Sequence, residues 1–212
     1  MIIAFSGKKQ SGKSTAVKDC GALLVGLSGH VREVNFAGYL KEICRRCFGY
    51  PDMDTEKGKS ELVITENDST TVLGILLYLG SDVMRRIDRD CWVNAWKSTV
   101  QDIIKYTPEG SPEPMILTSD VRFPNEVKAV HDLGGKVIRL LRNPLEDNHE
   151  SETALDDMEE HSIYACDYGQ WQDYVIIPVQ TEGMAFDAII DNREMTIEQQ
   201  NEAVRKVVQG WL

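Results

Sequence analysis

The stretch that decides the fold is Gly7-Lys8-Lys9-Gln10-Ser11-Gly12-Lys13-Ser14, which closely follows the apolar run Met1-Ile2-Ile3-Ala4-Phe5. It fits the pattern G-x-x-x-x-G-K-[ST], in which a glycine-bearing loop joins a strand to a helix and wraps around a phosphate. The apolar run is too short for a helix and predicts a buried strand, and residues 13–25 predict the helix. The context therefore agrees with the pattern, and we call residues 7–14 the P-loop.

The chemistry of the P-loop assigns a role to each position. Its glycines let the backbone approach a phosphate, so that successive N–H groups and the start of the helix face the anion. Lys13 is expected to reach the β- and γ-phosphates, and the Ser14 hydroxyl is expected to bind Mg²⁺. The P-loop predicts a bound nucleotide and Mg²⁺, and the predicted nucleotide-binding residues are Gly7, Lys8, Gln10, Ser11, Gly12, Lys13, Ser14 and Thr15.

Apolar runs and helical spacings alternate along the rest of the chain. Strands are predicted at 1–5, 31–36, 115–119, 136–141 and 174–179, and helices at 13–25, 39–48, 71–87, 92–104 and 124–133. A capping box of Thr196 and Gln199 opens a last helix, whose predicted inner side is Ile197, Ala203, Val204, Val207, Val208 and Trp211. This alternation predicts an α/β fold with a parallel sheet of about five strands flanked by helices. Residues 52–70 and 143–160 are polar and predict loops.

The connection between the second and third predicted strands is far longer than a simple crossover, at about 78 residues. We expect it to be a helical, substrate-binding insertion in one domain. The expected division is a core of residues 1–37, 115–142 and 166–212, an insertion of about 38–114, and a lid of about 143–165.

Composition excludes several classes of protein. With 23 basic and 34 acidic residues, the net charge of −11 argues against a protein that coats nucleic acid or an anionic membrane. No stretch approaches the roughly 20 apolar residues of a membrane span. The N-terminus does not resemble an export signal, so a cytoplasmic location with reduced cysteines is expected. Cys44 and Cys47 share a predicted helix face, which favours a structural role over a redox or metal role.

Asp120 follows the predicted strand 115–119 directly. A carboxylate at the carboxyl end of a parallel strand is suitably placed for the magnesium side of a nucleotide site. The alternative is a helix-capping role, because a helix follows within a few residues, and we favour the site role for Asp120.

Four further segments, with the P-loop, resemble the phage-type deoxynucleoside monophosphate kinases. Ser119-Asp120-Val121-Arg122-Phe123-Pro124-Asn125-Glu126 is similar to their D-V-R-F-P-N-E segment. Residues 79–85, followed by Trp92-Val93-Asn94, are similar to L-G-T-E-x-G-R and W-V-N. Residues 36–42 are similar to F-A-D-P-L-K-E, and residues 149–152 match H-x-S-E. Gly38-Tyr39 stands in place of D-P, and Met84 in place of the glycine before Arg85.

The resemblance implies a P-loop kinase with a monophosphate-binding insertion and a lid. The implied reaction transfers the γ-phosphate of ATP to a deoxynucleoside monophosphate. It places Lys13, Asp120, Arg122 and Arg142 at the reacting phosphates, with Arg142 belonging to the lid. The implied substrate-binding residues are Phe36, Lys41, Arg85, Arg86, Trp92, Ser151 and Glu152. The implied partners are small molecules only, and a homodimer is compatible with the resemblance.

The residue types agree with phosphoryl transfer, which needs positioning and cations rather than a covalent nucleophile. Arginine suits these positions because its planar fork binds phosphate oxygens in pairs. Two alternatives stay open. One is another small-molecule P-loop kinase acting on a nucleoside or on dephospho-coenzyme A, and the other is a nucleotide-switch or ATPase module. The sequence does not identify the accepted base.

Overall fold

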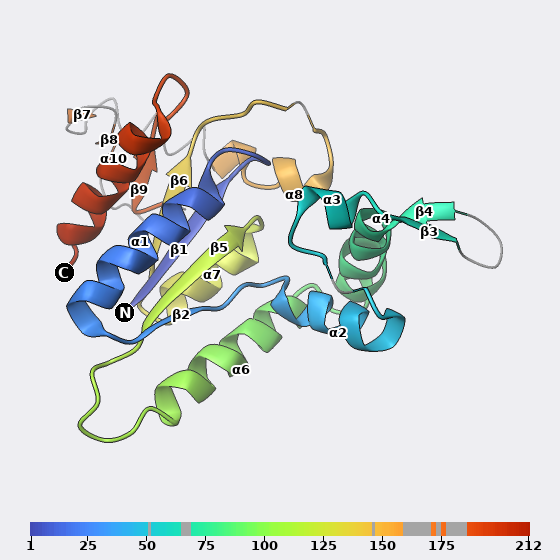
Figure 1. Ribbon diagram of the computed structural model, residues 1–212, viewed down its shortest axis with the longest axis horizontal. Helices are drawn as coiled ribbons and strands as arrows, with labels where there is room; N and C mark the ends of the chain where they lie inside the picture. The colour runs from blue at the N-terminus through green and yellow to red at the C-terminus, as the bar shows by residue number, and fades with distance from the viewer. Residues whose placement is uncertain (51, 65–68, 146, 159–170, 173–174, 177–185) are drawn as a thin grey trace. The chain divides into compact units, whose positions relative to one another are not determined.

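A computed structural model describes the chain except for residues 51, 65–68, 146, 159–170, 173–174 and 177–185 (Figure 1). The chain divides into two compact units. The first unit contains Met1–Asn35 and Thr99–Leu212, and the second contains Phe36–Ser98. None of the described helices combines the length and apolar character that a bilayer-crossing helix requires.

A seven-stranded sheet forms the centre of the first unit, in the order β2-β5-β1-β6-β9-β8-β7. Five of its strands run parallel, which confirms the predicted α/β fold. They are β1 (Ile2–Gly7), β2 (Val31–Glu33), β5 (Met115–Val121), β6 (Lys136–Leu140) and β9 (Ala188–Ile190). The short strands β7 (Trp171–Gln172) and β8 (Val175–Ile176) continue the sheet in antiparallel fashion.

The fifth parallel strand is not the one that the sequence predicts. Within the predicted strand 174–179, only β8 is described, and it runs antiparallel to β9, while residues 174 and 177–179 lie outside the described residues. The parallel partner of β6 is β9. Its apolar run has three residues between Asp187 and Asp191, which is too short to give a strand signal by itself.

Helices cover both faces of this sheet (Figure 1). On one face, α1 (Lys13–Ser28) packs against α10 (Ile197–Gln209). Ile3 and Phe5 of β1 join the apolar cluster beneath these helices. Side chains alternate along a strand, so Ile2 lies on the opposite face, the one that α7 (Pro124–Asp132) covers. Gly135 lies between Ile2 and Val130 of α7, and a Cβ on it would be 2.9 Å from Ile2 Cβ and 2.7 Å from Val130 Cγ1. α6 (Cys91–Lys105) continues from the second unit into the first.

The second unit contains more structure than the sequence predicts. Residues 52–70, predicted as a loop, contain α3 (Glu56–Lys59) and the two strands of a hairpin, β3 (Leu62–Ile64) and β4 (Ser69–Thr71). The hydroxyls of Thr55 and Thr71 accept hydrogen bonds from Gly58 and Gly74 and cap the helices that follow. Caps of this kind start a helix in a polar segment that has no apolar periodicity. The loop prediction for residues 52–70 relied on that periodicity and therefore missed these elements.

The predicted helix 71–87 is helical but not uniform. It consists of α4 (Val72–Leu77), a π-helical segment η1 (Tyr78–Met84) and α5 (Arg85–Ile87). α2 (Gly38–Phe48) precedes these elements and contributes Leu40 and Cys44 to their shared apolar cluster.

Cys44 and Cys47 both lie in α2, as predicted, but they differ in burial. Cys44 is fully buried, whereas Cys47 is exposed. Residues three apart on a helix differ by about 60° in direction, which is enough to carry the second thiol out of the apolar stripe. Burial raises the pKa of the Cys44 thiol, and Cys47 adds to that effect.

Candidate functional site

The P-loop joins β1 to α1, as its sequence predicts. Gly12 has a φ of 99°, and a Cβ placed on it would lie 2.3 Å from Gln200 Oε1. Gly7 has a φ of 152°, and its Cβ would lie 2.6 Å from Ser11 Oγ and 2.9 Å from Leu140 O. Both positions therefore require glycine, because the backbone has neither the conformation nor the space for a side chain.

The N-terminus of α1 is suited to an anion. No side chain caps it and its first turn holds no acidic residue, in a helix that is described throughout. Ser14 and Thr15 are exposed in that first turn. The first N–H groups of a helix have no intrahelical acceptor, and the helix dipole adds partial positive charge. This end of α1 can therefore bind phosphate oxygens.

Lys13 lies over the P-loop. Its Nζ donates to Gly7 O at 2.7 Å and to Lys8 O at 2.6 Å, and only 8% of the residue is exposed. The ammonium group is thus held within the P-loop, where an additional anionic acceptor is favourable.

Asp120 lies near the end of β5, the strand beside β1, and Arg122 follows that strand directly. Ser6 is in register with Val121, and the Ser6 hydroxyl donates to Val121 O at 3.0 Å. Asp120 is half-buried near the end of β5, and its negative charge acts on the Arg122 guanidinium. Burial lowers the pKa of Arg122, and Asp120 and Glu126 act in the opposite direction.

The donors expected for magnesium fit that ion chemically. Ser14 offers a hydroxyl oxygen and Asp120 a carboxylate oxygen, and Mg²⁺ prefers oxygen ligands together with water and phosphate. No group of three or more acidic, histidine or cysteine side chains that could hold a metal ion occurs in the part of the chain that the structure describes. The P-loop arrangement does not need one, because the substrate phosphates supply further ligands.

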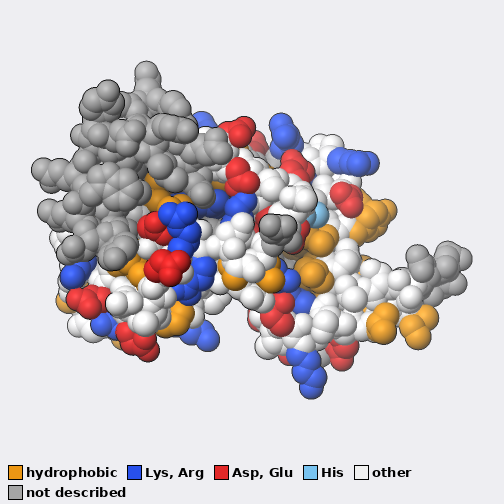
Figure 2. All heavy atoms as spheres, turned by 90° about the horizontal axis from the view of Figure 1, so that it is seen from above, with side chains coloured by type: hydrophobic (Ala, Val, Ile, Leu, Met, Phe, Trp, Pro, Cys, Tyr) orange, Lys and Arg blue, Asp and Glu red, His pale blue; other side chains and the backbone are white. Residues whose placement is uncertain are grey.

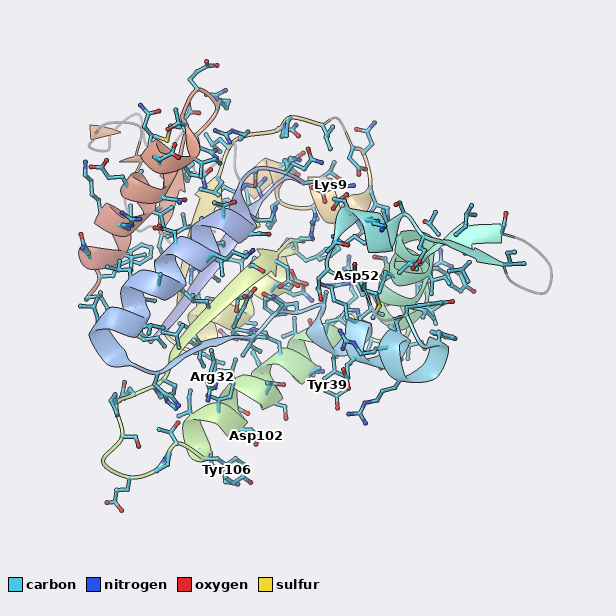
Figure 3. The ribbon with its side chains drawn as sticks, in the orientation of Figure 1. Lys9, Arg32, Tyr39, Asp52, Asp102 and Tyr106 are labelled. Carbon is cyan, nitrogen blue, oxygen red and sulfur yellow. The ribbon has the colours of Figure 1, made fainter. Side chains whose placement is uncertain are left out.

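A short helix, α8 (Glu150–Thr153), connects to the P-loop through Glu152. The Glu152 carboxylate accepts a hydrogen bond from the Lys9 N–H at 2.8 Å and another from Arg122 Nη1. Lys8 Nζ donates to Glu152 O and to Asp156. Figure 3 labels Lys9 in this loop, beside α8. A carboxylate here thus contacts an amide and a cation of the kind that bind phosphate.

Arg139 is a cation of this region that the sequence reasoning missed. It is 3% exposed, donates to Ser6 Oγ at 2.9 Å, and places Nη2 3.7 Å from Asp156 Oδ1. Its guanidinium also lies 5.6 Å from the centre of the Phe186 ring. The sequence does contain a signal for it, since Arg139 stands within the apolar strand 136–140. A charged side chain is buried there only if other groups pair with it, so the arginine indicates a buried polar site.

Arg142 contacts the loop after β9 in this structure. Its Nε donates to Asn192 O at 3.1 Å and its Nη2 donates to both Asn192 O and Met195 O. The predicted phosphate contact of Arg142 stays a prediction. The sequence reasoning also missed two buried amides near the P-loop, Asn192 and Gln200, and wrongly placed the exposed Ile197 on the inner side of α10.

The substrate-binding residues predicted in the second unit fall into two groups. Phe36 and Trp92 are buried. Phe36 stacks on Trp96 with 4.7 Å between ring centres, and Trp92 Nε1 donates to Gly80 O at 2.9 Å. The structure therefore gives both aromatic residues a packing role, and a contact with substrate stays a prediction.

The cations of that unit are more accessible. Lys41 Nζ pairs with Asp54 Oδ1 at 2.5 Å, and Arg85 Nη1 donates to Arg89 O at 3.3 Å. Arg86 is exposed. Ser151 lies in α8 of the first unit, where its hydroxyl is 2.9 Å from His149 Nδ1.

Basic and acidic side chains are mixed on the face of the molecule that Figure 2 shows. Lys and Arg side chains are interspersed with Asp and Glu on the described part of that face.

Comparison with known proteins finds a relative in sequence and a number of similar solved structures, two of which are described below. No family model matches the chain. A protein of Acanthamoeba polyphaga mimivirus, provisionally named a deoxynucleotide monophosphate kinase, is 27% identical over 176 residues, covering 77% of this chain and 86% of its own. A thymidylate kinase of Ehrlichia chaffeensis has a TM-score of 0.47 at 14% identity, over 99% of this chain and 98% of its own. The structure named APE1195 has a TM-score of 0.42 at 10% identity, over 99% and 95%. Both TM-scores are low, so the fold rests on the strand order and the P-loop.

Proposed function

We propose that this chain is an ATP-dependent deoxynucleoside monophosphate kinase. The observation that carries the proposal is the P-loop at an uncapped helix start, beside β5, which contains Asp120 and is followed directly by Arg122. A phosphate-binding loop alone specifies a nucleotide, not a reaction. The resemblance over residues 119–126 and the name of the mimivirus relative support a deoxynucleotide monophosphate as the acceptor.

In the proposed reaction, a phosphate oxygen of the acceptor forms a bond to the γ-phosphorus of ATP, and the bond from that phosphorus to the β,γ-bridging oxygen breaks. ADP leaves, and a deoxynucleoside diphosphate is formed. Lys13 and Arg122 neutralise charge on the phosphates, and Ser14 and Asp120 would hold Mg²⁺. When bound, Mg²⁺ would supply further positive charge to the phosphates.

Several finer roles belong to the same proposal. Residues of the second unit, among them Lys41, Arg85 and Arg86, bind the acceptor. Arg142 and the segment of about 143–165 act as a lid that keeps water from the γ-phosphate. Part of that segment, residues 146 and 159–165, lies outside the described residues. The enzyme acts in the cytoplasm, as a monomer or a homodimer.

The proposal is tested by coupling ADP release to a readable signal, with ATP, Mg²⁺ and a panel of deoxynucleotides, ribonucleotides and modified-base monophosphates. We expect ADP release to require a deoxynucleoside monophosphate. Lys13→Ala should lower kcat by at least about a hundredfold, because a P-loop cation is lost. Lys18→Ala, an exposed lysine of the same helix, is the matched control and should retain activity. ADP release that is indifferent to the acceptor would instead identify an ATPase and reject the proposal.

A further inference from the structure

Two buried amide side chains donate hydrogen bonds to backbone carbonyls of the P-loop. Asn192 follows β9 and Gln200 lies near the start of α10, and both are completely buried. Asn192 Nδ2 donates to Ser11 O at 2.7 Å and to Gln200 Oε1 at 2.6 Å. Gln200 Nε2 donates to Gly12 O at 3.2 Å. The two side chains thus bind two successive carbonyls of the P-loop and each other.

These two bonds help to fix the direction of the neighbouring amides. The Gly12 carbonyl also accepts the Thr15 N–H at 3.1 Å and the Ala16 N–H at 3.0 Å within α1, and Gln200 adds a third bond to it. In a trans peptide, the carbonyl of one residue and the N–H of the next point in opposite directions. Because the Ser11 carbonyl is bound to Asn192, the Gly12 N–H points away from Asn192. Because the Gly12 carbonyl is bound to Gln200, the Lys13 N–H points away from Gln200. Gly12 and Lys13 stand at the start of α1, where N–H groups bind phosphate oxygens.

The contact is also sterically close. A Cβ on Gly12 would lie 2.3 Å from Gln200 Oε1 and 2.9 Å from Gln200 Nε2. Gln200 occupies the same stripe of α10 as Ala203, Val204 and Val207, which are apolar. Burying an amide costs free energy unless its hydrogen bonds are made, so an apolar residue would fill this position more simply. The bonds to the P-loop give a physical reason for an amide here.

We propose that Asn192 and Gln200 are positioning residues that hold the P-loop amides in the geometry that binds the phosphates of ATP. They act through the backbone of Ser11 and Gly12 and touch no reacting atom. Asn192 also accepts the Arg142 N–H at 2.7 Å, so the pair links the P-loop to the end of β6 and to the loop after β9. This inference rests on the proposed function only in taking ATP as the ligand.

The test measures the affinity of the whole chain for ATP with Mg²⁺, without acceptor, in Gln200 variants. Gln200→Met keeps the length of the side chain and removes both hydrogen bonds. We expect it to weaken ATP binding about tenfold, the scale of one or two lost hydrogen bonds. Gln200→Glu keeps the acceptor for Asn192, loses the donor to Gly12 and adds a negative charge, so it should weaken binding at least as much. With an acceptor present, kcat should fall and the KM of the acceptor should stay unchanged.

Val204→Ala is the matched control, because it removes buried volume one turn further along α10 without touching the P-loop. It should lower the melting temperature and leave ATP affinity unchanged. ATP affinity of Gln200→Met within about twofold of wild type would overturn the inference, and so would an equal loss in Val204→Ala. If Gln200→Met fails to fold, Gln200→Glu decides by the same criterion. Wild-type chain that binds ATP but phosphorylates no deoxynucleotide would reject the proposed function and leave this test valid.

Discussion

Asp187 is a buried acid of the first unit whose pKa is strongly shifted. It is 5% exposed and accepts hydrogen bonds from Lys136 Nζ at 2.8 Å and from the Val137 N–H at 2.8 Å. Its carboxylate also lies 2.9 Å from His131 Nε2, which donates to it when protonated. Burial alone would raise its pKa. The hydrogen bonds from His131, Lys136 and Val137 outweigh burial and lower the pKa to about 2. The carboxylate therefore stabilises the fold in its ionised form.

The consequence is a defined dependence of stability on pH. Because the pKa is depressed from 3.8 to about 2 on folding, the contribution is complete above about pH 4 and is lost as the pH falls through about 2. We expect Asp187→Asn to lower the free energy of unfolding at pH 7 by about 2 kcal/mol, with a difference that narrows between pH 4 and 2. Denaturant unfolding across this pH range measures the effect.

Asp191→Asn is the control for that series. Asp191 lies at the other end of β9 and pairs with the exposed Arg193 at 2.6 Å. The hydrogen bond from Arg193 lowers its pKa, but a surface pair of this kind contributes about 0–1 kcal/mol. If Asp191→Asn and Asp187→Asn lowered the free energy of unfolding equally, the argument for Asp187 would be contradicted.

At the scale of elements, the π-helical segment η1 has an identifiable packing partner. Gly80 lies within it, its carbonyl accepts the Trp92 indole N–H, and a Cβ on Gly80 would lie 2.8 Å from Leu40 Cδ2. A π segment displaces the backbone from the regular helix path, which here brings Gly80 against α2 and Trp92. Trp92 therefore donates a hydrogen bond to the backbone of η1 and also packs among the apolar side chains of this unit.

Gly80→Ala tests this packing. We expect it to lower the free energy of unfolding by about 1–3 kcal/mol, because an added methyl overpacks the contact with Leu40. Gly26→Ala in α1 is the control, since its Cβ would meet nothing within 4 Å, and it should raise stability by about 0.5–1 kcal/mol. Urea unfolding of both variants gives the comparison. A stabilised Gly80→Ala would show that the space is larger than the structure indicates.

At the scale of the whole molecule, the two units hold different parts of the predicted site. The P-loop, Asp120 and Arg122 belong to the first unit, and Arg85 and Arg86 belong to the second. If the second unit binds the acceptor, the KM values for the two substrates should respond separately to changes in each unit.

Arg85→Ala should raise the KM of the deoxynucleoside monophosphate by about tenfold or more and leave the KM of ATP unchanged, because a phosphate-binding cation is lost. Initial rates at varied acceptor and ATP measure both constants. Arg46→Ala, an exposed arginine of the same unit that pairs with Glu42, is the control and should change neither. Equal increases in the two KM values would remove the acceptor role from Arg85.

The sequence by itself determined the features that depend on local order along the chain. Spacing and backbone freedom decide the P-loop, since Gly7 and Gly12 are needed whatever surrounds them. Long apolar runs likewise determined β1, β5 and β6, and the spacing of apolar residues determined α1, α6 and α10. Each of these patterns lies within the residues of the element that it predicts, so it can be recognised without knowledge of the tertiary structure.

Only the tertiary structure decided which distant residues meet. It made β9, with its three apolar residues, the fifth parallel strand, because pairing with β6 supplies the hydrogen bonds that so short a run cannot specify alone. It brought Arg139 to Ser6, and it seated Asn192 and Gln200 beneath the P-loop. Ser11 and Asn192 are 181 residues apart in the sequence, and no local pattern predicts their contact. The folded sheet brings them together.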